Sequence, residues 1–435
     1  MSGWWRRARR AVVDAFAVRS RQVLLFAALA GVTTGLGVAL FESIVVEWLL
    51  DSFLDLPLWA LALMPTAGLV IAAVSLHVLG PTSPGTTDAY LQAFHDPSER
   101  LTERPVAARM LAAIGTLGFG GAMGLEGPSL YLGASVGASL QSRFQRFFRS
   151  VDHRVLMVAG AAAGVAAIFK APATGAVFAL EVPYQDDFAR KMLLPALVAA
   201  AGGYLGFVAV HGTQSLVPPG AGSPALSAGD LVGAIVLGIA GGLVARSFAA
   251  LLRRAKRVST SVGAPARIVA AGAAMAGVLL LGHAVAHRSI AIGVGYGAIA
   301  WALEPNHAAW IVLTVMLLRI VATAATVAGG GVGGLFIPLV VTGALLGRAA
   351  GAMLPGLDEH LALIIGVAAV LGAGYRVPLA AVVFVAEATG RPGFIVPALL
   401  AAVAADLMMG RRSVTTYQQP STAGPADPGG DRPGG

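Results

Sequence analysis

The chain has 435 residues, of which 57% are apolar and only 12% charged, whereas an ordinary soluble domain has about 25% charged residues; this composition predicts a membrane protein. The 56 glycines and the low aromatic content of 7% favour closely packed helices over a membrane β-barrel, so we expect an all-α polytopic fold. The formal charge of +8 does not predict a nucleic acid partner, because lysine and arginine also gather on cytoplasmic loops, and the absence of cysteine excludes disulfides and thiolate metal sites.

The chain begins with a basic segment, residues 1–22, which contains six arginines. Residues 23–50 then form an apolar run, interrupted by Glu42 and Glu47, that is long enough to cross a hydrocarbon core of about 30 Å. Positive charge beside the first span predicts a cytoplasmic N-terminus. The run continues well past the signal-peptide-like residues 28–30, so we expect a retained first span rather than a cleaved leader.

The remaining basic clusters predict which loops face the cytoplasm of a multi-pass protein in the plasma membrane. Those assigned to the inside are residues 100–109, 143–154, 170–191, 246–257 and 411–412. Residues 211–230 contain no lysine or arginine and are assigned to the outside. Residues 418–435 are rich in Pro, Gly and Asp, which predicts a disordered tail on the cytoplasmic side.

An internal repeat divides the apolar part of the chain into two halves, about 23–210 and 229–410. Residues 109–128 and 319–338 both place an arginine nineteen residues before a proline, at an offset of 210. Further matches extend the repeat: Gly133 and Gly137 with Gly343 and Gly347, and Pro172, Phe178 and Glu181 with Pro378, Phe384 and Glu387. Repeats of this kind in transporters are commonly inverted, with the permeant site at their interface, so we expect two inverted halves.

The two matching Gly/Pro segments carry the chemistry. Gly124, Gly127 and Pro128 interrupt an apolar stretch and predict that a new helix begins near the proline. Gly334 and Pro338 predict the same in the other half. The free N–H groups of a helix N-terminus bind anions, and two such termini that face one another describe a site for a small anion.

Glu126 lies inside the first of these segments, where an unpaired carboxylate costs roughly 2.5–3.5 kcal/mol. When ionised, it can occupy the anion position itself, and an ion about 4 Å away would be repelled by about 4 kcal/mol at an effective dielectric constant of 20. We therefore predict that Glu126 is a gate that leaves the site when it is protonated or displaced. The alternative is a simple helix cap; the equivalent residue, Phe336, is neutral.

These segments resemble the CLC family of chloride channels and proton-coupled anion transporters. Residues 124–128 are similar to the family's G(K/R)EGP motif and residues 334–338 to its GxFxP motif. The resemblance covers residues 23–417 and includes Arg104-Pro-Val, Phe169-Lys-Ala-Pro and Arg376-Val-Pro-Leu. It implies a fold of two inverted halves with many tilted and partial helices, assembled as a homodimer with one pore per subunit, and no CBS domains.

The resemblance also implies roles for individual residues. Glu126 matches the gating glutamate, and the backbone N–H groups of Gly127, Phe336 and Ile337 would bind the central anion. Tyr417 is the candidate for the inner tyrosine whose hydroxyl donates to that anion, with an interfacial belt tyrosine as the alternative.

The inner loop of the family, GSGIP, matches Ser83, Pro84 and Gly85 with a proline where the anion-contacting serine stands. This departure implies weaker discrimination between chloride and nitrate, unless a shift of one residue puts Ser83 in that role. A second departure is Leu125, which replaces the basic residue before the gating glutamate.

The third departure bears on the mechanism, because family exchangers carry an internal proton-transfer glutamate where this chain has Val182. We therefore expect a passive, Glu126-gated channel for chloride or nitrate, with a proton-coupled antiporter as the alternative and a fluoride exporter behind both. The partners are a small anion and membrane lipid, and no cofactor is expected. No apolar segment combines a nucleophile with a base, so we expect no enzyme activity.

Other charged residues are given structural interpretations. The repeated spacing of Glu181 and Glu387 suggests roles at helix ends, and Arg109 and Arg319 near span ends are expected to pair or snorkel. Lys170 is assigned either to the inner mouth or to a solvated loop. His283 and His287 lack the intervening glutamate of a zinc motif, so no metal site is expected.

Overall fold

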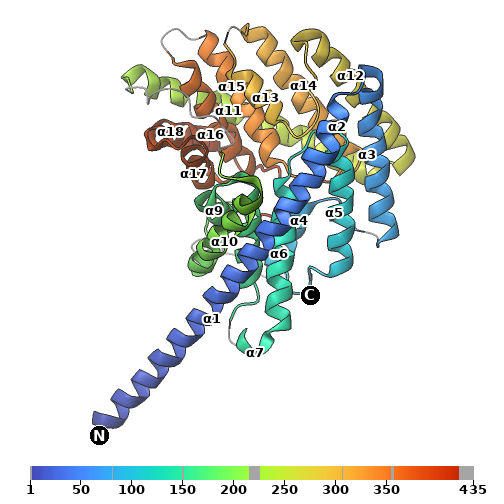
Figure 1. Ribbon diagram of the computed structural model, residues 1–435. Helices are drawn as coiled ribbons and strands as arrows, with labels where there is room; N and C mark the ends of the chain where they lie inside the picture. The colour runs from blue at the N-terminus through green and yellow to red at the C-terminus, as the bar shows by residue number, and fades with distance from the viewer. Residues whose placement is uncertain are drawn as a thin grey trace, which may run out of the picture.

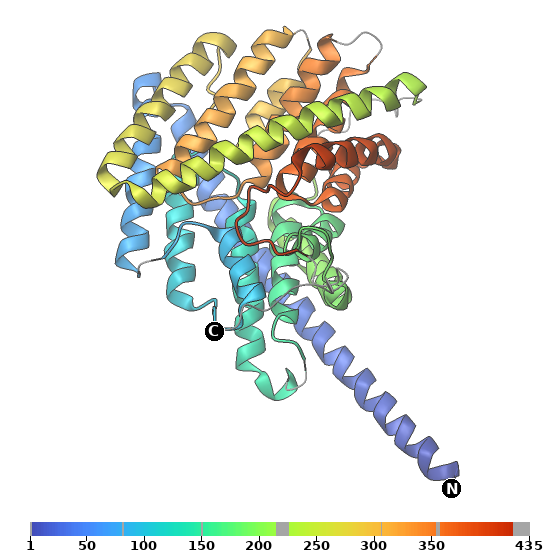
Figure 2. The same ribbon diagram turned by 180° about the vertical axis from the view of Figure 1, so that it is seen from behind.

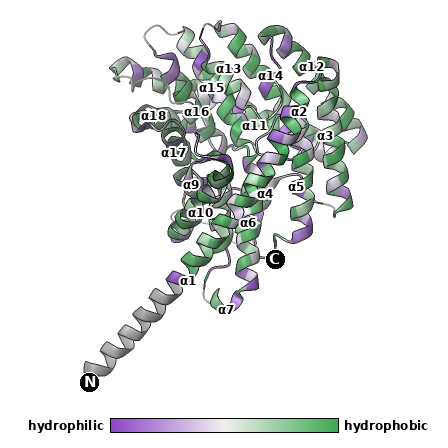
Figure 3. Cartoon of the chain, viewed as in Figure 1, coloured by the Kyte–Doolittle hydropathy of each residue, from purple (hydrophilic) through white to green (hydrophobic). Residues whose placement is uncertain are grey.

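The computed structural model describes residues 2–80, 82–148, 151–214, 226–305, 307–353 and 357–420. Within these residues the protein is helical and contains no β-strand, only two isolated β-bridges. Eight of the described helices are long and apolar enough to cross a membrane, and Figure 3 shows that hydrophobic residues predominate along the described helices. Many large apolar side chains are exposed, such as Leu25 (71%) and Trp59 (72%). The predicted all-α polytopic fold is confirmed.

The helices fall into two series of the same order. The first half contains α1 (Ser2–Glu42), η1 (Ser43–Leu50), α2 (Asp51–Leu54), α3 (Leu58–Val78), α4 (Thr86–His95), α5 (Glu103–Gly118), α6 (Glu126–Arg143), α7 (Gln145–Phe148), α8 (Val155–Phe169), α9 (Pro172–Glu181), η2 (Arg190–Met192) and α10 (Leu193–His211). The second contains α11 (Ala228–Ser261), α12 (Ala264–Ala286), α13 (Tyr296–Leu303), α14 (Ala309–Ala328), α15 (Phe336–Met353), α16 (Glu359–Tyr375), α17 (Pro378–Thr389), η3 (Pro392–Phe394) and α18 (Ile395–Met409). Figures 1 and 2 show the halves packed together, blue to green against lime to red.

The contacts between the halves show that the repeat is inverted. Gly124 and Gly334 form an antiparallel bridge, with N–H···O distances of 2.9 and 2.7 Å in the two directions. Helices α6 and α15 begin two residues after these glycines, so they run away from the bridge in opposite directions. Thr116 and Thr326, also 210 residues apart, each accept a backbone N–H from the other half, from Val332 (3.0 Å) and Ala122 (3.1 Å) respectively.

A second reciprocal contact joins the short helices α9 and α17. Glu181, at the end of α9, accepts the N–H groups of Leu379 (3.1 Å) and Ala380 (2.8 Å) in the first turn of α17. Glu387, near the end of α17, accepts the N–H groups of Ala173 (2.9 Å) and Thr174 (2.6 Å) in the first turn of α9. Each carboxylate therefore caps the helix of the other half, as predicted from the repeated spacing.

Substitution of Glu387 by alanine is expected to destabilise the protein by about 2 kcal/mol, because two N–H groups and the Thr174 hydroxyl lose their acceptor in an apolar setting. Glu387→Gln keeps one acceptor oxygen and should cost less. Thermal unfolding of the purified protein measures both, with the exposed Glu99→Ala as the control. Equal stability of the Glu387→Ala and Glu99→Ala proteins would contradict the capping role.

The equivalent arginines of the repeat hold equivalent loops. Arg109, 7% exposed, donates to the carbonyl of Ser83 (2.9 Å), in the loop before α4. Arg319, 2% exposed, donates to the carbonyls of Ile292 (2.7 Å) and Gly293 (2.9 Å), in the loop before α13. Both guanidinium groups are thus buried against backbone oxygens, which agrees with a structural role.

The paired glycines pack helices together, as predicted. A side chain on Gly133 of α6 would collide with the carbonyl of Gly160 on α8, and one on Gly343 of α15 with that of Gly366 on α16. Backbone contact this close is typical of helices that associate in a membrane through small residues.

The basic cluster predicted on the cytoplasmic side at residues 170–191 does not lie on one side of the membrane. The ammonium group of Lys170 donates to the carbonyl of His211 (3.4 Å), at the end of α10, whereas Lys191 lies two residues before the start of that helix. A helix of this length spans about 28 Å, so the two lysines lie at opposite ends of a span. The charge count did not register α8 and α9, which are only 15 and 10 residues long and separate Lys170 from the basic residues on either side of it.

The predicted disordered tail begins too early. Gln418 is buried and donates from Nε2 to the carbonyls of Val182 (2.9 Å) and Tyr375 (2.7 Å). Gln419 forms a parallel bridge with Tyr184. Backbone pairing and a buried amide hold this segment in place despite its polar composition; residues 421–435 lie outside the described residues.

Candidate functional site

The two helix N-termini predicted to bind an anion meet at the centre of the protein. Helix α6 begins at Glu126 and α15 at Phe336, two residues before Pro128 and Pro338 respectively. The bridge between the preceding glycines fixes the two helix ends against one another. A side chain on Gly127 would lie 2.8 Å from the Cα atom of Gly334, so the two tips are in direct contact.

The carboxylate of Glu126 lies at the tip of α15. Its Oε1 atom accepts the N–H of Phe336 at 2.6 Å, and the N–H of Ile337 also interacts with it. The side chain is only 2% exposed, and Oε2 has no hydrogen-bond partner among the described residues. An acidic group thus occupies the backbone N–H groups predicted to bind the anion, which are called the anion cradle below. The function of Glu126 as a gate remains a prediction.

The glycines of the two motifs leave the space in which this carboxylate lies. A methyl group on Gly124 would overlap the carboxylate of Glu126, and one on Gly334 would overlap both that carboxylate and the Gly127 nitrogen. The carboxylate can therefore lie here only while both positions lack a side chain, for steric reasons rather than because of backbone conformation.

The ring of Phe336 anchors the tip of α15 in an aromatic cluster. Its centroid lies 4.4 Å from that of Phe169, 5.3 Å from Phe178 and 5.1 Å from Phe384. These rings come from α8, α9 and α17, so several elements together hold the N–H groups of α15 in place. Phe336, which is the repeat equivalent of Glu126, is thus a packing residue.

A hollow of about 250 Å³ approaches the tips from the side on which α11 ends. It is called the inner hollow here, because the basic end of α11 is predicted to face the cytoplasm. The predicted residues Ser83, Pro84, Gly85 and Tyr417 line it, together with Gly333 and Leu335 beside the tip of α15. The Ser83 hydroxyl, however, lies 3.2 Å from Arg109 Nη2 and accepts from that group. Ser83 therefore does not point at the helix tips.

Three hydroxyl groups that the sequence analysis missed lie nearest the tips in this inner hollow. Thr86 is in contact range of Gly127, and Thr87 hydrogen-bonds the hydroxyl of Tyr375. The Tyr375 hydroxyl also accepts the N–H of Leu335 (3.3 Å), immediately before α15. Two threonines directly after a Pro-Gly turn, and a tyrosine ending an otherwise apolar helix, were the available sequence signals.

Tyr417 does not reach the tips in the way predicted. It lines the hollow, but its side chain is 42% exposed and makes no hydrogen bond with the described residues. The chain after α18 is extended here, so the tyrosine lies toward the mouth, and Tyr375 is the tyrosine at the site.

Tyr375→Phe is expected to weaken anion binding roughly three- to tenfold, because a net hydrogen bond is worth about 0.5–1.5 kcal/mol and the site loses a hydroxyl. Tyr417→Phe, the matched control, should change the affinity less than about twofold, within the lower end of that range. Isothermal titration of the purified proteins with chloride measures both. A larger effect at Tyr417 would restore the original assignment.

A second hollow, of about 460 Å³, is the counterpart of the first in the inverted repeat. It is lined by the end of η1, by α2 and by the loop before α13, which are equivalent to the end of α11 and the loop before α4. Tyr296 takes the place of Thr86, at the same offset of 210 residues. Asp51 and Arg288 add charged groups to the apolar lining of this second hollow, which is called the outer hollow here. Because the halves are inverted, we expect the two hollows to lie on opposite sides of the helix tips.

The position of the absent internal glutamate is apolar in the structure. Val182 is fully buried directly after α9, and its carbonyl accepts from Gln418. The neighbouring Glu181 is committed to capping α17. Among the described residues that line the inner hollow, Asp88 is the acidic one. It is paired with Lys256 at 2.6 Å and does not replace the glutamate at the position of Val182.

One group of metal-ligand-type side chains occurs among the described residues, at the outer end of α10. His211 lies with its Nε2 3.2 Å from Glu42 and its Nδ1 3.5 Å from Glu47. Both ring nitrogens already face carboxylates, so His211 ties α10 to α1 and η1.

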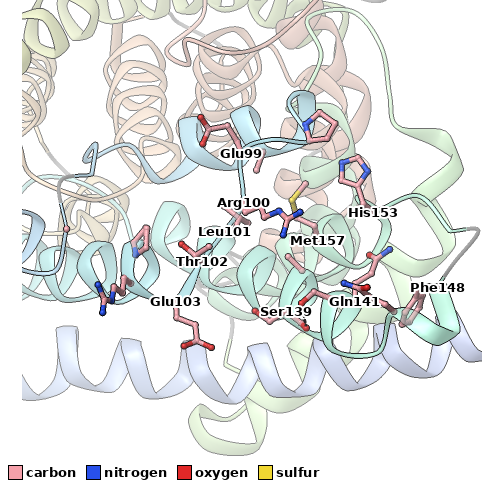
Figure 4. Close-up of a pocket in the computed structure, with 18 of the residues that line it drawn as sticks. Glu99, Arg100, Leu101, Thr102, Glu103, Ser139, Gln141, Phe148, His153 and Met157 are labelled. Carbon is pink, nitrogen blue, oxygen red and sulfur yellow. Dashed lines mark hydrogen bonds between the residues drawn. The ribbon is translucent and has the colours of Figure 1, made fainter.

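A further hollow, of about 1070 Å³, lies away from the helix tips, between the loop preceding α5 and the end of α6. In Figure 4, Arg100 reaches into it toward Met157, while Glu103 points away. None of the residues at the two tips lines it, so we place it outside the anion site.

The sequence is similar to known anion transport proteins. A family described as "Voltage gated chloride channel" matches residues 68–410. A putative chloride channel protein, ClcB-like, of Ralstonia nicotianae is 30% identical over 368 residues, covering 80% of this chain and 82% of that protein. The H(+)/Cl(-) exchange transporter ClcA of Cronobacter sakazakii is 28% identical over 408 residues, covering 89% and 86%.

Solved structures agree in fold. A CLC-type fluoride/proton antiporter has a TM-score of 0.77 at 24% identity, covering 92% of this chain and 98% of that one. A slow cyanobacterial Cl⁻/H⁺ antiporter has a TM-score of 0.76 at 20% identity, covering 89% and 94%. Most of these names denote proton-coupled exchange, so the expectation of a passive channel is not supported and its alternative is favoured.

Proposed function

Because the chain belongs to the voltage-gated chloride channel family, also called CLC, we propose that it is a proton-coupled anion antiporter in which Glu126 both blocks the anion path and carries the proton. The observation that carries this proposal is the Glu126 carboxylate at the N-terminus of α15, with the two hollows as the proposed paths to it. The names of the relatives support exchange, and Val182 is the feature that favours passive conduction instead.

The chemistry follows from competition for one cradle. Ionised Glu126 accepts the N–H groups that an anion needs, so carboxylate and anion exclude one another there. At about 4 Å their repulsion is about 4 kcal/mol at an effective dielectric constant of 20. Protonation removes that repulsion and weakens the carboxyl group as an acceptor, so the anion replaces it; the proton leaves on the opposite side when the carboxylate returns.

Protons need an inner route that does not use residue 182. The inner hollow supplies one candidate, since Thr86, Thr87 and Tyr375 line it and place hydroxyl groups between its mouth and the tips. Hydroxyl groups both donate and accept, so they support a chain of water molecules. We propose this hollow as the shared path of anions and protons.

The transported anion is proposed to be chloride or nitrate, with fluoride as the competing substrate to be tested. The cradle consists of backbone N–H groups without a fixed positive side chain at the tips, which suits weak, reversible binding of small monovalent anions. Pro84 at the inner loop supplies no hydroxyl, which supports weak discrimination between chloride and nitrate.

Flux from reconstituted liposomes tests the proposal. Vesicles loaded with chloride, nitrate or fluoride are diluted into low-anion buffer while the internal pH is recorded. An antiporter drives protons against their gradient when anions move down theirs, and the anion reversal potential shifts with pH. A reversal potential that is independent of pH would return the protein to the channel class.

We also propose a homodimer in the plasma membrane, with both termini in the cytoplasm. Helices α10 and α18 expose apolar side chains, including Leu194 (58%), Leu205 (60%) and Leu407 (73%), which suit either lipid or a second copy. Light scattering in detergent distinguishes a dimer from a monomer, and cysteine labelling from each side of the membrane tests the orientation.

A further inference from the structure

A basic hollow of about 990 Å³ lies where α11 ends. The residues that line it belong to other segments of the chain than those that form the anion cradle. Its cationic side chains come from the last turns of α11 and from the chain after α18. They are Arg253, Arg254, Lys256, Arg257, Arg411 and Arg412. None of the described residues that line it is acidic. Two segments separated by some 150 residues therefore converge on one concentrated positive charge.

Most of this charge has no partner. Lys256 pairs with Asp88 at 2.6 Å, and Arg253 donates to the carbonyl of Ser413 at 3.4 Å. The guanidinium groups of Arg257 and Arg412 repel that of Arg253. The remaining four side chains are exposed and make no hydrogen bond or ion pair with any described residue: Arg254, Arg257, Arg411 and Arg412. Like charges held together without compensation are relieved when an anion binds between them.

We propose that this basic hollow binds a phosphate-bearing anion, of the kind that an anionic phospholipid presents in its headgroup. Guanidinium groups match phosphate oxygens with paired N–H donors, and several arginines around one concave surface can share a single phosphate group. The cradle at Glu126, by contrast, offers backbone N–H groups and suits a smaller ion.

The surroundings favour a lipid as the source of the phosphate. Helix α11 crosses the outside of the molecule (Figure 2) and exposes Leu243 (52%) and, next to Arg257 in the chain, Val258 (40%). Val262 (38% exposed) follows directly after the helix. Acyl chains can lie along such side chains while the headgroup enters the hollow. Basic pockets between helices on the cytoplasmic side of membrane proteins bind anionic headgroups, and both segments carry basic clusters that predict that side.

The basic hollow adjoins the inner hollow of the anion path. Lys256, Thr260, Thr415 and Thr416 line both. A phosphate group bound there would stand at the inner mouth and change the local concentration of permeating anions. This consequence for transport rests on the proposed function, whereas the binding site itself does not.

A binding experiment tests the site without any transport. Purified full-length protein in neutral detergent is titrated with short-chain phosphatidylglycerol, short-chain phosphatidylcholine or sodium pyrophosphate, and bound ligand is measured by native mass spectrometry. We expect phosphatidylglycerol to bind at least about tenfold more tightly than phosphatidylcholine, and Arg411→Gln/Arg412→Gln to lower that affinity roughly thirtyfold. Arg254→Gln/Arg257→Gln is the second variant, should the first fail to fold.

The matched control, Arg143→Gln/Arg146→Gln, removes the same charge from exposed positions on α6 and α7 and should retain wild-type affinity. Binding of phosphatidylglycerol alone identifies a lipid headgroup, and binding of pyrophosphate as well extends the site to soluble phosphates. Equal affinity for the two lipids together with no binding of pyrophosphate would overturn the proposal, as would equal losses in the control and hollow variants. A negative result here leaves the flux test of antiport unaffected, and the reverse also holds.

Discussion

Glu126→Gln is expected to abolish proton movement while anions continue to flow. The amide has nearly the shape of the carboxylate that accepts the Phe336 N–H, but it neither binds nor releases a proton at working pH. It also competes less well for the cradle, since hydrogen bonds to a charged acceptor are about twice as strong as neutral ones. Anion-driven proton transport should fall at least about tenfold, because the one carrier is removed.

The anion flux is also expected to depend on pH in a defined direction. In the wild type, the blocking form of Glu126 is ionised, so anion flux should rise as the pH falls; in the glutamine variant the flux should vary little with pH. Parallel recording of anion efflux and internal pH in liposomes measures both. Glu103→Gln, at an exposed position, is the control. A folded Glu126→Gln protein without any anion flux would refute the gate, and one that still pumps protons would move the carrier elsewhere.

Gly124→Ala is expected to drive the Glu126 carboxylate from the cradle. All three nearest atoms that a methyl group at this position would meet belong to the Glu126 side chain, so the flexible side chain gives way rather than the backbone. The variant should transport anions with proton coupling reduced at least about fivefold, because an overlap of this size displaces a side chain outright. The liposome assay measures the ratio of protons to anions.

A double substitution isolates the cause. In a Glu126→Ala background the overlap disappears, so adding Gly124→Ala should change flux less than about twofold, which is the non-additivity expected of residues in contact. Gly277→Ala, on a helix where nothing lies within 4 Å of the added methyl group, is the matched control. Additive effects of the two substitutions would show that Gly124 acts independently of the carboxylate.

The anion cradle was predictable because backbone chemistry carries it. Glycine and proline at fixed spacing determine where α6 and α15 begin, whatever the surrounding side chains are, and the offset of 210 residues pairs the two ends. The capping roles of Glu181 and Glu387 followed in the same way. Periodicity and Gly/Pro signals report local backbone behaviour, and these features are local.

The hydroxyl groups around the cradle were not predictable for the opposite reason. Tyr375 lies at the end of α16, forty residues from the tip that it contacts, and only tertiary packing brings its hydroxyl to Leu335. Tyr417 was preferred because a resemblance pointed to the C-terminal segment, but the buried amide of Gln418 draws that segment toward Val182. Lys170 was misplaced because the charge rule grouped it with Lys191, although the two lysines lie at opposite ends of α10.

The crossed carboxylates of α9 and α17 restrict how this protein can move. Alternating access in inverted-repeat transporters is commonly achieved when one repeat rocks against the other as a rigid body. Here any such rocking would break both reciprocal caps, the glycine bridge and the two threonine contacts together. The transport cycle is therefore expected to proceed within a nearly static frame, through swings of single side chains, and a covalent cross-link between the two halves at this seam should leave turnover intact.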